Sequence, residues 1–325
     1  MEPFFSILIP IYNQVGKMDR CIHSLKNQTF TDFEVILVDD GSTDASYEML
    51  LSFAEDPRFR VLRHEKNSSV MAARYTGMQA AGGSYCLFLD SDDYVEINML
   101  EVLHRSLAHS PADILRFGFF NESDGAVFKP VKTDDPFSAF LDGKEFPAIW
   151  KRAYSREVVR KLVEKVTPFY CNMGEDSFYS CVFYSLAGSV GEIDDALYHY
   201  VDGGGMSGLN KAIPEEKLKR DLDSAEASTV NTLSFLEQYN PAFYEKARIF
   251  LRSISRYILW MAINAETDLA RVVDRLRWIK EYYGEDLYFF GCRKLLECRV
   301  RILISGDSYT IKPEDFFAML MEEAM

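Results

Sequence analysis

The sequence lacks the features that would place it among nucleic-acid-binding or membrane-spanning proteins. It has no basic excess, because 36 Lys and Arg stand against 50 Asp and Glu and give a formal net charge of −14. A nucleic-acid-binding surface needs cations to replace the counterions of the phosphates, so nucleic acid is not expected as a partner. No apolar run reaches the ~20 residues that a spanning helix needs. We therefore expect a cytoplasmic protein, with peripheral contact at the inner face of the cell membrane left open.

Several short motifs with a known chemistry are absent as well. The six cysteines form no CxxC pair and mostly lie in apolar runs, which predicts reduced, packed thiols. Residues 1–13 are apolar but have neither a basic flank nor a small-residue cleavage site, so they predict a first strand rather than a signal peptide. The phosphate-binding loop GxxxxGK followed by Ser or Thr is missing, and the segment after the first apolar run is not a glycine-rich turn. An ATPase or a dehydrogenase is therefore disfavoured.

The first half of the chain alternates between two periodicities. Apolar runs typical of buried strands are residues 4–10, 33–40, 58–64 and 84–90. Helix-period segments between them are residues 17–28, 44–55 and 69–83, the last ending in a Gly-Gly pair that suits a C-terminal cap. This alternation predicts an α/β fold with a mostly parallel sheet flanked by helices. In such sheets ligands bind at the carboxyl ends of the strands.

The second half changes character after residue 213. Residues 112–120 and 125–131 predict a hairpin, residues 133–147 a loop with a short helix, residues 174–188 a helix, and residues 196–201 a strand. Residues 202–210 hold four glycines and predict a flexible loop, which we expect to close over a bound ligand. Helical patterns follow up to Val300. We therefore predict a catalytic domain over residues 1–213 and a C-terminal helical lobe over residues 214–325.

Acidic residues cluster at two expected strand ends. They are Asp39, Asp40 and Asp44 after the second strand, and Asp90, Asp92 and Asp93 after the fourth. Either cluster alone is adequately explained by turn and helix-capping residues. Two at neighbouring strand ends favour a hard divalent cation, Mg²⁺ or Mn²⁺, which binds through one or two carboxylates and substrate phosphates.

These residues belong to a set of motifs that resembles the family-2 glycosyltransferases of the GT-A fold. The motifs are Pro10-Ile11-Tyr12-Asn13, Val38-Asp39-Asp40-Gly41-Ser42, Ala73-Arg74, Leu89-Asp90-Ser91-Asp92-Asp93, Gly174-Glu175-Asp176 and Leu197-Tyr198-His199-Tyr200. The resemblance covers roughly the first two-thirds of the chain, and this set of motifs in the right order is far more specific than a lone DxD. It implies an inverting transferase that uses a nucleotide-diphospho-sugar.

The resemblance also implies a role for each motif. Residues expected to bind the nucleotide-sugar are Pro10, Tyr12, Asn13, Asp39, Arg74, Asp90 and Ser91, with Asp39 accepting from a uracil-like base edge. Asp92 would bind the metal, Mn²⁺ or Mg²⁺, and Asp176 would be the general base for the acceptor hydroxyl. Two assignments keep alternatives: His199 is either a second metal ligand or a satisfied core histidine, and Arg74 either contacts the donor phosphates or braces Asp90 or Asp92.

The sequence departs from the family pattern in four places. Tyr75 stands where relatives often have Asn, and Ser68-Ser69 replace a usual glycine. Trp150-Lys151-Arg152 replace Trp-Asn-Lys, and Val201 replaces an arginine. None of these residues is an expected metal ligand or base, so the departures bear on the donor sugar and on acceptor geometry.

The C-terminal lobe carries a different charge from the rest. Residues 241–312 hold 13 Lys or Arg and 9 Asp or Glu, a net +4 in an acidic protein. Arg248, Arg252 and Arg256 fall on one helix face. A solvated face, an interface with anionic lipid headgroups, and a homodimer contact all fit this pattern.

Together these observations predict an inverting, metal-dependent glycosyltransferase. The donor is expected to be UDP-linked, the acceptor a hydroxyl of a glycan or lipid-linked molecule, and the process surface-polysaccharide synthesis. The alternatives are a sugar-phosphate nucleotidyltransferase, which would normally carry a glycine- and basic-rich loop after its first strand, and a non-catalytic nucleotide-sugar-binding module.

Overall fold

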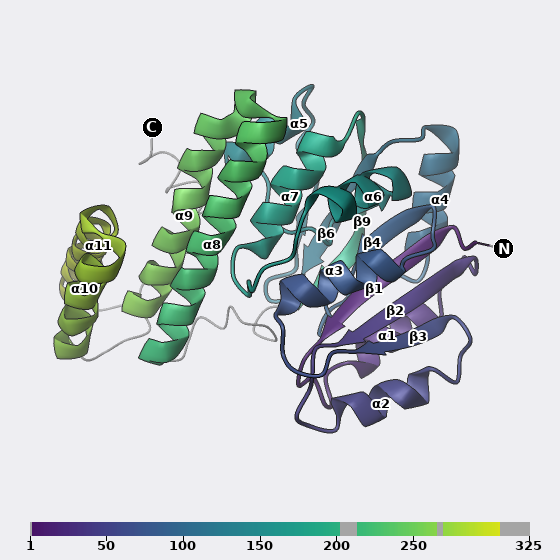
Figure 1. The fold of residues 1–325 in the computed structure, drawn as a ribbon, viewed down its shortest axis with the longest axis horizontal. Coiled ribbons are helices and arrows are strands. Elements are labelled where there is room, and N and C mark those ends of the chain that lie inside the picture. Colours follow the sequence, from purple (N-terminus) through teal and green to yellow (C-terminus); the bar gives the residue numbers. More distant parts are fainter. Residues whose placement is uncertain (1, 202–212, 265–268, 306–325) are drawn as a thin grey trace. The chain divides into compact units, whose positions relative to one another are not determined.

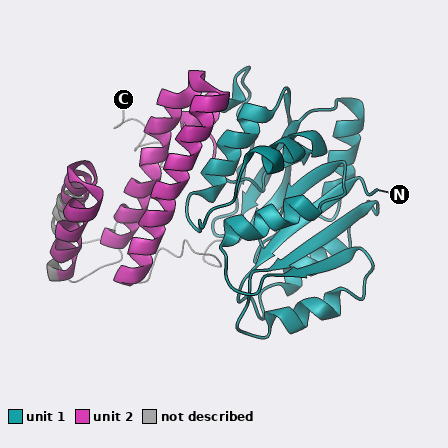
Figure 2. Cartoon of the chain, viewed as in Figure 1, with its two compact units in different colours: residues 1–137, 147–207 teal, residues 138–146, 208–325 magenta. Residues whose placement is uncertain are grey.

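A computed structural model describes residues 2–201, 213–264 and 269–305 of the chain (Figure 1). These residues divide into two compact units, which are drawn in different colours in Figure 2. Unit 1 comprises residues 1–137 and 147–207, and unit 2 comprises residues 138–146 and 208–325. The glycine-rich loop expected at residues 202–210 lies outside the described residues.

The predicted alternation of strands and helices is confirmed in the first part of unit 1. Its elements are β1 (Phe5–Ile11), α1 (Asp19–Lys26), β2 (Phe33–Asp39), α2 (Ser46–Phe53), β3 (Phe59–Arg63), α3 (Val70–Ala80) and β4 (Tyr85–Phe88). Strands β1, β2 and β4 are largely apolar because both faces of the sheet are covered there, and every residue of β2 except Glu34 is buried. The edge strand β3 is less buried and carries Arg60 and Arg63. The Gly-Gly pair after α3 is not its cap. A Cβ at Gly83 would lie 2.5 Å from the backbone nitrogen of Ser6, so this glycine permits close packing against β1.

The rest of unit 1 completes the sheet and adds helices around it. Its elements are β5 (Tyr94–Val95), α4 (Met99–His109), β6 (Ile114–Asn121), β7 (Ala126–Phe128), β8 (Arg152–Ser155), α6 (Arg156–Lys165), α7 (Glu175–Leu186) and β9 (Val190–Tyr200). The predicted hairpin is the β6–β7 pair. The predicted helix at residues 174–188 is α7.

The nine strands form a single sheet in the order β3-β2-β1-β4-β8-β6-β9-β5, with β7 pairing to β6. Strands β1 to β4 pair in parallel, whereas β8 runs antiparallel to both β4 and β6. The fold is therefore the expected α/β class with a mixed sheet. Right-handed crossovers place α3 on the opposite face from α1 and α2. Figure 1 shows α3 and α6 in front of the sheet.

Unit 2 is helical in its described residues, as the sequence predicts for the C-terminal region. It consists of α5 (Pro136–Leu141, mostly in this unit), α8 (Glu215–Tyr239), the 3-10 turn η1 (Pro241–Phe243), α9 (Tyr244–Asn264), α10 (Leu269–Tyr283) and α11 (Glu285–Ser305). Lys246 of α9 pairs with Asp142 at 2.7 Å. The boundary predicted at residue 213 stays a prediction.

None of the five cysteines that the structure describes in detail forms a disulfide, and four of the five are buried, which agrees with the expected reduced, packed thiols. Within the described residues, no helix has the length and apolar character needed to cross a membrane.

Candidate active site

The carboxyl ends of β1, β2 and β3 lie side by side. In the parallel register Ile11 is opposite Asp39, and Asp39 is opposite Arg63. The loops that follow the strands are joined to each other. The backbone nitrogen of Asn13 donates to Ser42 Oγ at 3.0 Å, and Asn13 Oδ1 accepts from the backbone nitrogen of Thr43 at 2.9 Å. Asn13 adopts a positive φ of 53°, which asparagine tolerates better than most residues. Its role in the structure is to hold this edge of the sheet together.

Asp40 and Gly41 fix the loop after β2. The Asp40 carboxylate accepts from the backbone nitrogens of Ser68 and Ser69, each at 2.9 Å, and lies 2.7 Å from His64 Nδ1. Gly41 has a φ of +69°, and a Cβ there would lie 2.5 Å from the Lys66 carbonyl carbon. The Asp-Gly pair therefore joins the β2 loop to the β3–α3 loop.

Asp39 has a different environment from its neighbour. Its side chain is fully buried. Its Oδ1 accepts from the backbone nitrogen of Ser42 at 3.2 Å. Its Oδ2 has no hydrogen-bond donor in the described part of the chain, although Arg63 Nε lies 3.1 Å away. A buried carboxylate oxygen without a donor is costly, and a ligand N–H would satisfy it. Two other expected nucleotide residues lie at the end of β1, where Pro10 is half-buried and Tyr12 is 42% exposed.

The acidic segment after β4 divides into bound and available carboxylates. Asp93 is buried: Tyr198 donates to its Oδ2 at 2.5 Å, and the backbone nitrogen of Val201 donates to its Oδ1 at 2.7 Å. Burial and the nearby Asp90 raise the pKa of Asp93 to about 8. Ser91 is buried as well. Asp92 is half-buried, and burial followed by the charge of Asp90 raises its pKa.

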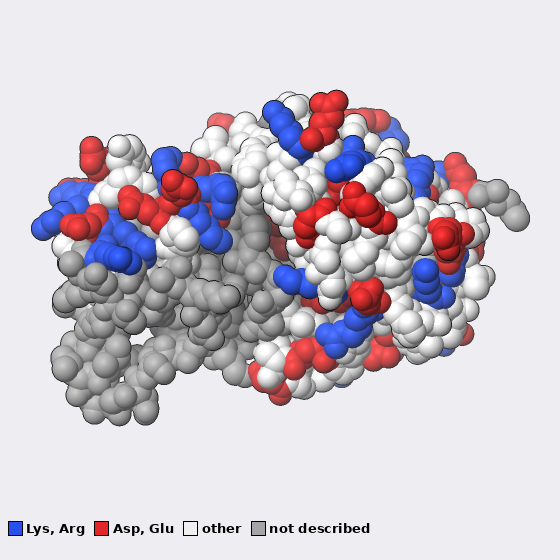
Figure 3. Space-filling view, turned by 90° about the horizontal axis from the view of Figure 1, so that it is seen from below, with Lys and Arg blue, Asp and Glu red and all other residues white. Residues whose placement is uncertain are grey.

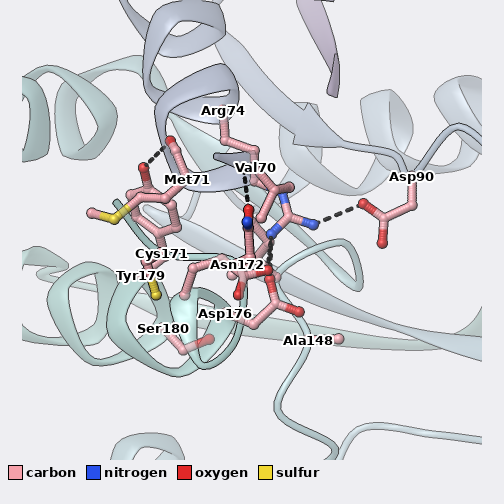
Figure 4. Close-up of polar contacts among 12 residues, drawn as sticks. Val70, Met71, Arg74, Asp90, Ala148, Cys171, Asn172, Asp176, Tyr179 and Ser180 are labelled. Atoms are coloured by element: carbon pink, nitrogen blue, oxygen red, sulfur yellow. Dashed lines mark hydrogen bonds and ion pairs between the residues drawn. The ribbon is translucent and has the colours of Figure 1, made fainter. Parts of the chain in front are cut away.

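Arg74 joins the end of β4 to the start of α7 (Figure 4). Its side chain is only 3% exposed. Nη2 contacts Asp90 Oδ1 at 2.7 Å, while Nη1 contacts Glu175 Oε1 at 2.9 Å and Asp176 Oδ1 at 2.7 Å. The alternative in which Arg74 braces Asp90 thus agrees with the geometry. The guanidinium holds the acidic strand end and the expected base in one cluster.

Asp176 is positioned by the beginning of α7. Gly174, with a φ of +91°, precedes the helix and makes Glu175 and Asp176 its first two residues. The Asp176 side chain remains 25% exposed. Burial raises the pKa of Asp176 to about 8; Arg74 opposes this effect, and Glu175 and Asp90 reinforce it. A carboxylate with a pKa near working pH is suited to accept a proton.

His199 has both ring nitrogens engaged. Nδ1 lies 2.8 Å from Glu122 Oε1, and Nε2 lies 2.9 Å from Glu96 Oε1. The ring is stacked between Tyr94 and Phe120, with centroids 4.2 and 4.6 Å away. This is the arrangement of a satisfied histidine. Metal binding by His199 would require one of these contacts to break.

The carboxylates after β4 are the candidate ligands for a divalent cation. Among the described residues, no group of three or more His, Cys, Asp and Glu is arranged to hold a metal ion. Burial first, and then the negative charge of Asp90 two residues away, raise the pKa of Asp92, so the two carboxylates repel each other. A cation would remove this repulsion, and a diphosphate would complete its coordination. The residues fit a metal that is shared with substrate rather than one held by protein alone.

The sequence analysis assigned no role to four residues that contribute to this site. Tyr198 accepts from the backbone nitrogen of Asp90 at 3.2 Å and so fixes the acidic segment through two aspartates. Glu96 and Glu122 hold His199. Arg63 contacts Asp39. Tyr198 belongs to one of the family motifs and Arg63 ends a strand expected beside β2, whereas nothing in the sequence pointed to Glu96 or Glu122.

A half built of parallel strands, an acidic segment after β4 and a carboxylate at the start of α7 define a GT-A-type α/β protein. A family model described as glycosyl transferase family 2 matches residues 6–170, and the chain belongs to this family of glycosyltransferases.

Curated relatives agree with this family. The chain is 32% identical over 217 residues to the uncharacterized glycosyltransferase EpsJ of Bacillus subtilis, a match covering 62% of this chain and 61% of EpsJ. It is 29% identical over 212 residues to glycosyltransferase GlyA of Streptococcus pneumoniae, covering 60% of this chain and 30% of GlyA. A longer match, 36% identical over 319 residues, is to a cholesterol galactosyltransferase of Borreliella burgdorferi, covering 88% of this chain and 86% of that protein.

Solved structures share the fold. S. aureus TarS 1–349 superposes with a TM-score of 0.65 at 17% identity, covering 98% of this chain and 90% of that one. The same protein has been solved with UDP-GlcNAc. The mannosyltransferase PcManGT of Pyrobaculum calidifontis, solved with GDP-Man and Mn²⁺, gives a TM-score of 0.55 at 15% identity, covering 100% and 85%.

Proposed function

We propose that this glycosyltransferase moves a sugar from a UDP-linked donor to a hydroxyl of a glycan or lipid-linked acceptor, with inversion at the anomeric carbon. The observation that carries the proposal is the Arg74 cluster, in which one guanidinium contacts both Asp90 at the end of β4 and Asp176 at the start of α7. This contact brings the expected donor-phosphate side and the expected base within the span of a single side chain.

In the proposed reaction, Asp176 accepts the proton of the acceptor hydroxyl. The acceptor oxygen forms the new bond to the anomeric carbon, and the bond to the diphosphate oxygen breaks with its electron pair. A single displacement from the face opposite the leaving group inverts the anomeric centre. Arg74 orients the Asp176 carboxylate through the 2.7 Å contact to Oδ1.

Donor binding is assigned to the strand ends. Asp39 would accept from the base, Pro10 and Tyr12 would line its pocket, and Asp90 would face the ribose. Asp92 would hold Mn²⁺ or Mg²⁺, which when bound would neutralise charge on the leaving diphosphate. Neighbours solved with UDP-GlcNAc, and with GDP-Man and Mn²⁺, support this assignment. We leave His199 outside the proposed metal site, because its two ring nitrogens already contact the carboxylates of Glu96 and Glu122.

The acceptor and the cellular setting are proposed more broadly. A relative whose match covers 88% of this chain is named a cholesterol galactosyltransferase. This name supports including lipids among the proposed acceptors. We place the reaction in surface-polysaccharide synthesis on the cytoplasmic side, with peripheral membrane contact or a homodimer as roles for residues 214–325. Lys and Arg side chains gather among Asp and Glu on the part of unit 2 that Figure 3 draws in charge colours.

The proposal is tested by titrating UDP and UDP-sugars calorimetrically with Mn²⁺ or with a chelator, and then assaying transfer and donor hydrolysis. Asp92→Asn should abolish the Mn²⁺-dependent part of UDP affinity and leave the fold intact. Asp124→Asn, in the exposed β6–β7 turn, is the matched control and should behave like the parent. Binding without turnover would indicate a non-catalytic module. Pyrophosphate release from UTP and a sugar phosphate would indicate a nucleotidyltransferase.

A further inference from the structure

Arg63 is the last residue of β3, and its guanidinium is exposed at the same edge of the sheet as Asp39. The side chain is 45% exposed. Its guanidinium carbon lies over the Tyr47 ring, 3.9 Å from the ring centre, so a cation–π contact positions the group. Its Nε lies 3.1 Å from Asp39 Oδ2. Among the described residues these are its contacts, and the guanidinium has five N–H donors to offer.

Asp39 and Arg63 therefore present complementary groups side by side. Asp39 Oδ2 is a buried acceptor that no donor in the described residues satisfies. Arg63 is an adjacent donor that lies over the Tyr47 ring. On the other side of Asp39, the end of β1 carries the exposed ring of Tyr12, which suits stacking against a planar ligand.

We propose that Arg63 and Asp39 together read the nucleobase of the donor, with Asp39 accepting from a ring N–H and Arg63 donating to the carbonyl next to it. This inference rests on the proposed function and adds a specificity-determining residue to it. An N–H flanked by a carbonyl is present in uracil and guanine. Cytosine and adenine carry a lone pair where the N–H would be, and that lone pair would face the Asp39 carboxylate. The pair thus selects uracil or guanine against cytosine and adenine.

A simpler role for Arg63 is to compensate the charge of Asp39. The two roles differ in what they predict for modified bases and for lysine. Charge compensation lowers affinity equally for every nucleotide when Arg63 is removed, and a lysine replaces it. If Arg63 recognises the base, its removal lowers affinity only for bases that carry the contacted carbonyl, and a lysine does not restore it because an ammonium does not reproduce a planar guanidinium.

The test measures calorimetric dissociation constants at fixed Mn²⁺ for UDP, CDP, GDP, 3-methyl-UDP, 2-thio-UDP and 4-thio-UDP. The proteins are the parent, Arg63→Gln, Arg63→Lys and Arg60→Gln. Arg60 is the matched control, because it lies on β3 and donates to the Ala80 carbonyl at 2.8 Å, away from the strand end. Circular dichroism melting shows that each variant is folded.

The parent should bind UDP about 100-fold more tightly than CDP, since a site that hydrogen-bonds one base leaves buried groups unpaired with another. It should bind 3-methyl-UDP as weakly as CDP. Both Arg63 variants should lose about tenfold in UDP affinity, the usual worth of a charge-assisted hydrogen bond, and Arg60→Gln should lose none. The loss in Arg63→Gln should disappear with one of the two thio-analogues, which identifies the carbonyl contacted.

Equal losses for UDP and both thio-analogues, or full recovery in Arg63→Lys, would overturn the inference while leaving UDP binding and the proposed function standing. If GDP binds in place of UDP with the same dependence on Arg63, the reading of the base edge is supported and the donor base becomes guanine. If the parent binds none of these nucleotides, the proposed function fails and this inference fails with it.

Discussion

The ends of β2 and β4 carry similar acidic sequences, but the carboxylates at the two ends have different hydrogen-bond and charge partners. At each end one aspartate is bound to the surrounding loops: Asp40 by Ser68, Ser69 and His64, and Asp93 by Tyr198 and Val201. These aspartates fix the backbone. The neighbouring carboxylates, Asp39 at one end and Asp92 at the other, are the two that we propose bind a ligand.

The two ends differ in charge balance. At the β2 end, Arg63 and His64 lie directly against Asp39 and Asp40. At the β4 end, Arg74 is shared with Glu175 and Asp176, and the pKa values of Asp92 and Asp93 are raised by burial and by Asp90. An excess of carboxylates favours a cation, whereas a compensated carboxylate favours a neutral N–H donor. The proposed assignment therefore gives the same residue type a metal at one strand end and a base at the other.

The largest expected effect tests whether the β4 end is joined to catalysis through Arg74. Asp176→Asn keeps the shape of the side chain and removes its basicity. Transfer should fall by on the order of 10²–10⁴-fold, the usual worth of a positioned base, while UDP affinity with Mn²⁺ stays near that of the parent. Rapid-quench rates and calorimetry measure the two quantities. Near-parent transfer would place the base elsewhere, with Glu175 the next candidate, and lost UDP binding would place Asp176 in the donor site.

The next prediction concerns the aspartate that fixes the β2 end. Asp40→Asn should lower the free energy of unfolding by about 1–3 kcal/mol, because one of the buried groups that Asp40 satisfies is left without an acceptor. Chemical denaturation measures this loss. Asp44→Asn, in the same exposed loop, is the control and should be near neutral. The Mn²⁺ dependence of UDP binding should not change in Asp40→Asn; if it disappears, the division of roles between the two strand ends is wrong.

A smaller effect is expected in the pH dependence of transfer. The base must be ionised, so the rate falls as pH drops through the pKa of Asp176, which is raised to about 8. Glu175 contributes to this increase. Glu175→Gln should therefore move the acidic limb of kcat/KM to lower pH, whereas Glu157→Gln on the exposed surface of α6 should leave it in place. A limb that does not move, or moves upward, would show that Asp176 titrates independently of Glu175.

The smallest expected effect concerns the backbone of Ser69, in the loop that Asp40 binds. Ser69, whose backbone nitrogen binds Asp40, has a φ of +92°, a region that favours glycine. Ser69 is also the N-cap of α3, where its Oγ accepts from the backbone nitrogen of Ala72. Ser69→Gly should raise the free energy of unfolding by about 1 kcal/mol, because relief of backbone strain exceeds the few tenths of a kcal/mol lost with this cap. Ser68→Gly, without a positive φ, should be slightly destabilising. Denaturation midpoints that rank the two variants in the opposite order would contradict the strain at Ser69.

The sequence predicted more of the fold than of the site. The strands were identifiable because their apolar runs are short and bounded by turns, and the helices because of their 3.6-residue period. The family pattern that the sequence resembles usually has a glycine before α3, and the φ of +92° at Ser69 lies in a region that favours glycine. The short strands β5 and β8 were not predicted, because two and four residues carry too little pattern.

The sequence by itself determined which residue types stand at each strand end, because parallel α/β topology sends every carboxyl end to the same edge. Tertiary structure alone decided which of these carboxylates are available. Asp92 and Asp93 are adjacent and chemically identical, yet Tyr198, over 100 residues further on, binds one and not the other. The sequence left two alternatives open for His199, and only the fold places Glu96 and Glu122 at its two ring nitrogens, as in a satisfied histidine. Hydrogen-bond partners brought from distant segments leave no local pattern, so only the folded chain shows which side chains remain free to bind a ligand.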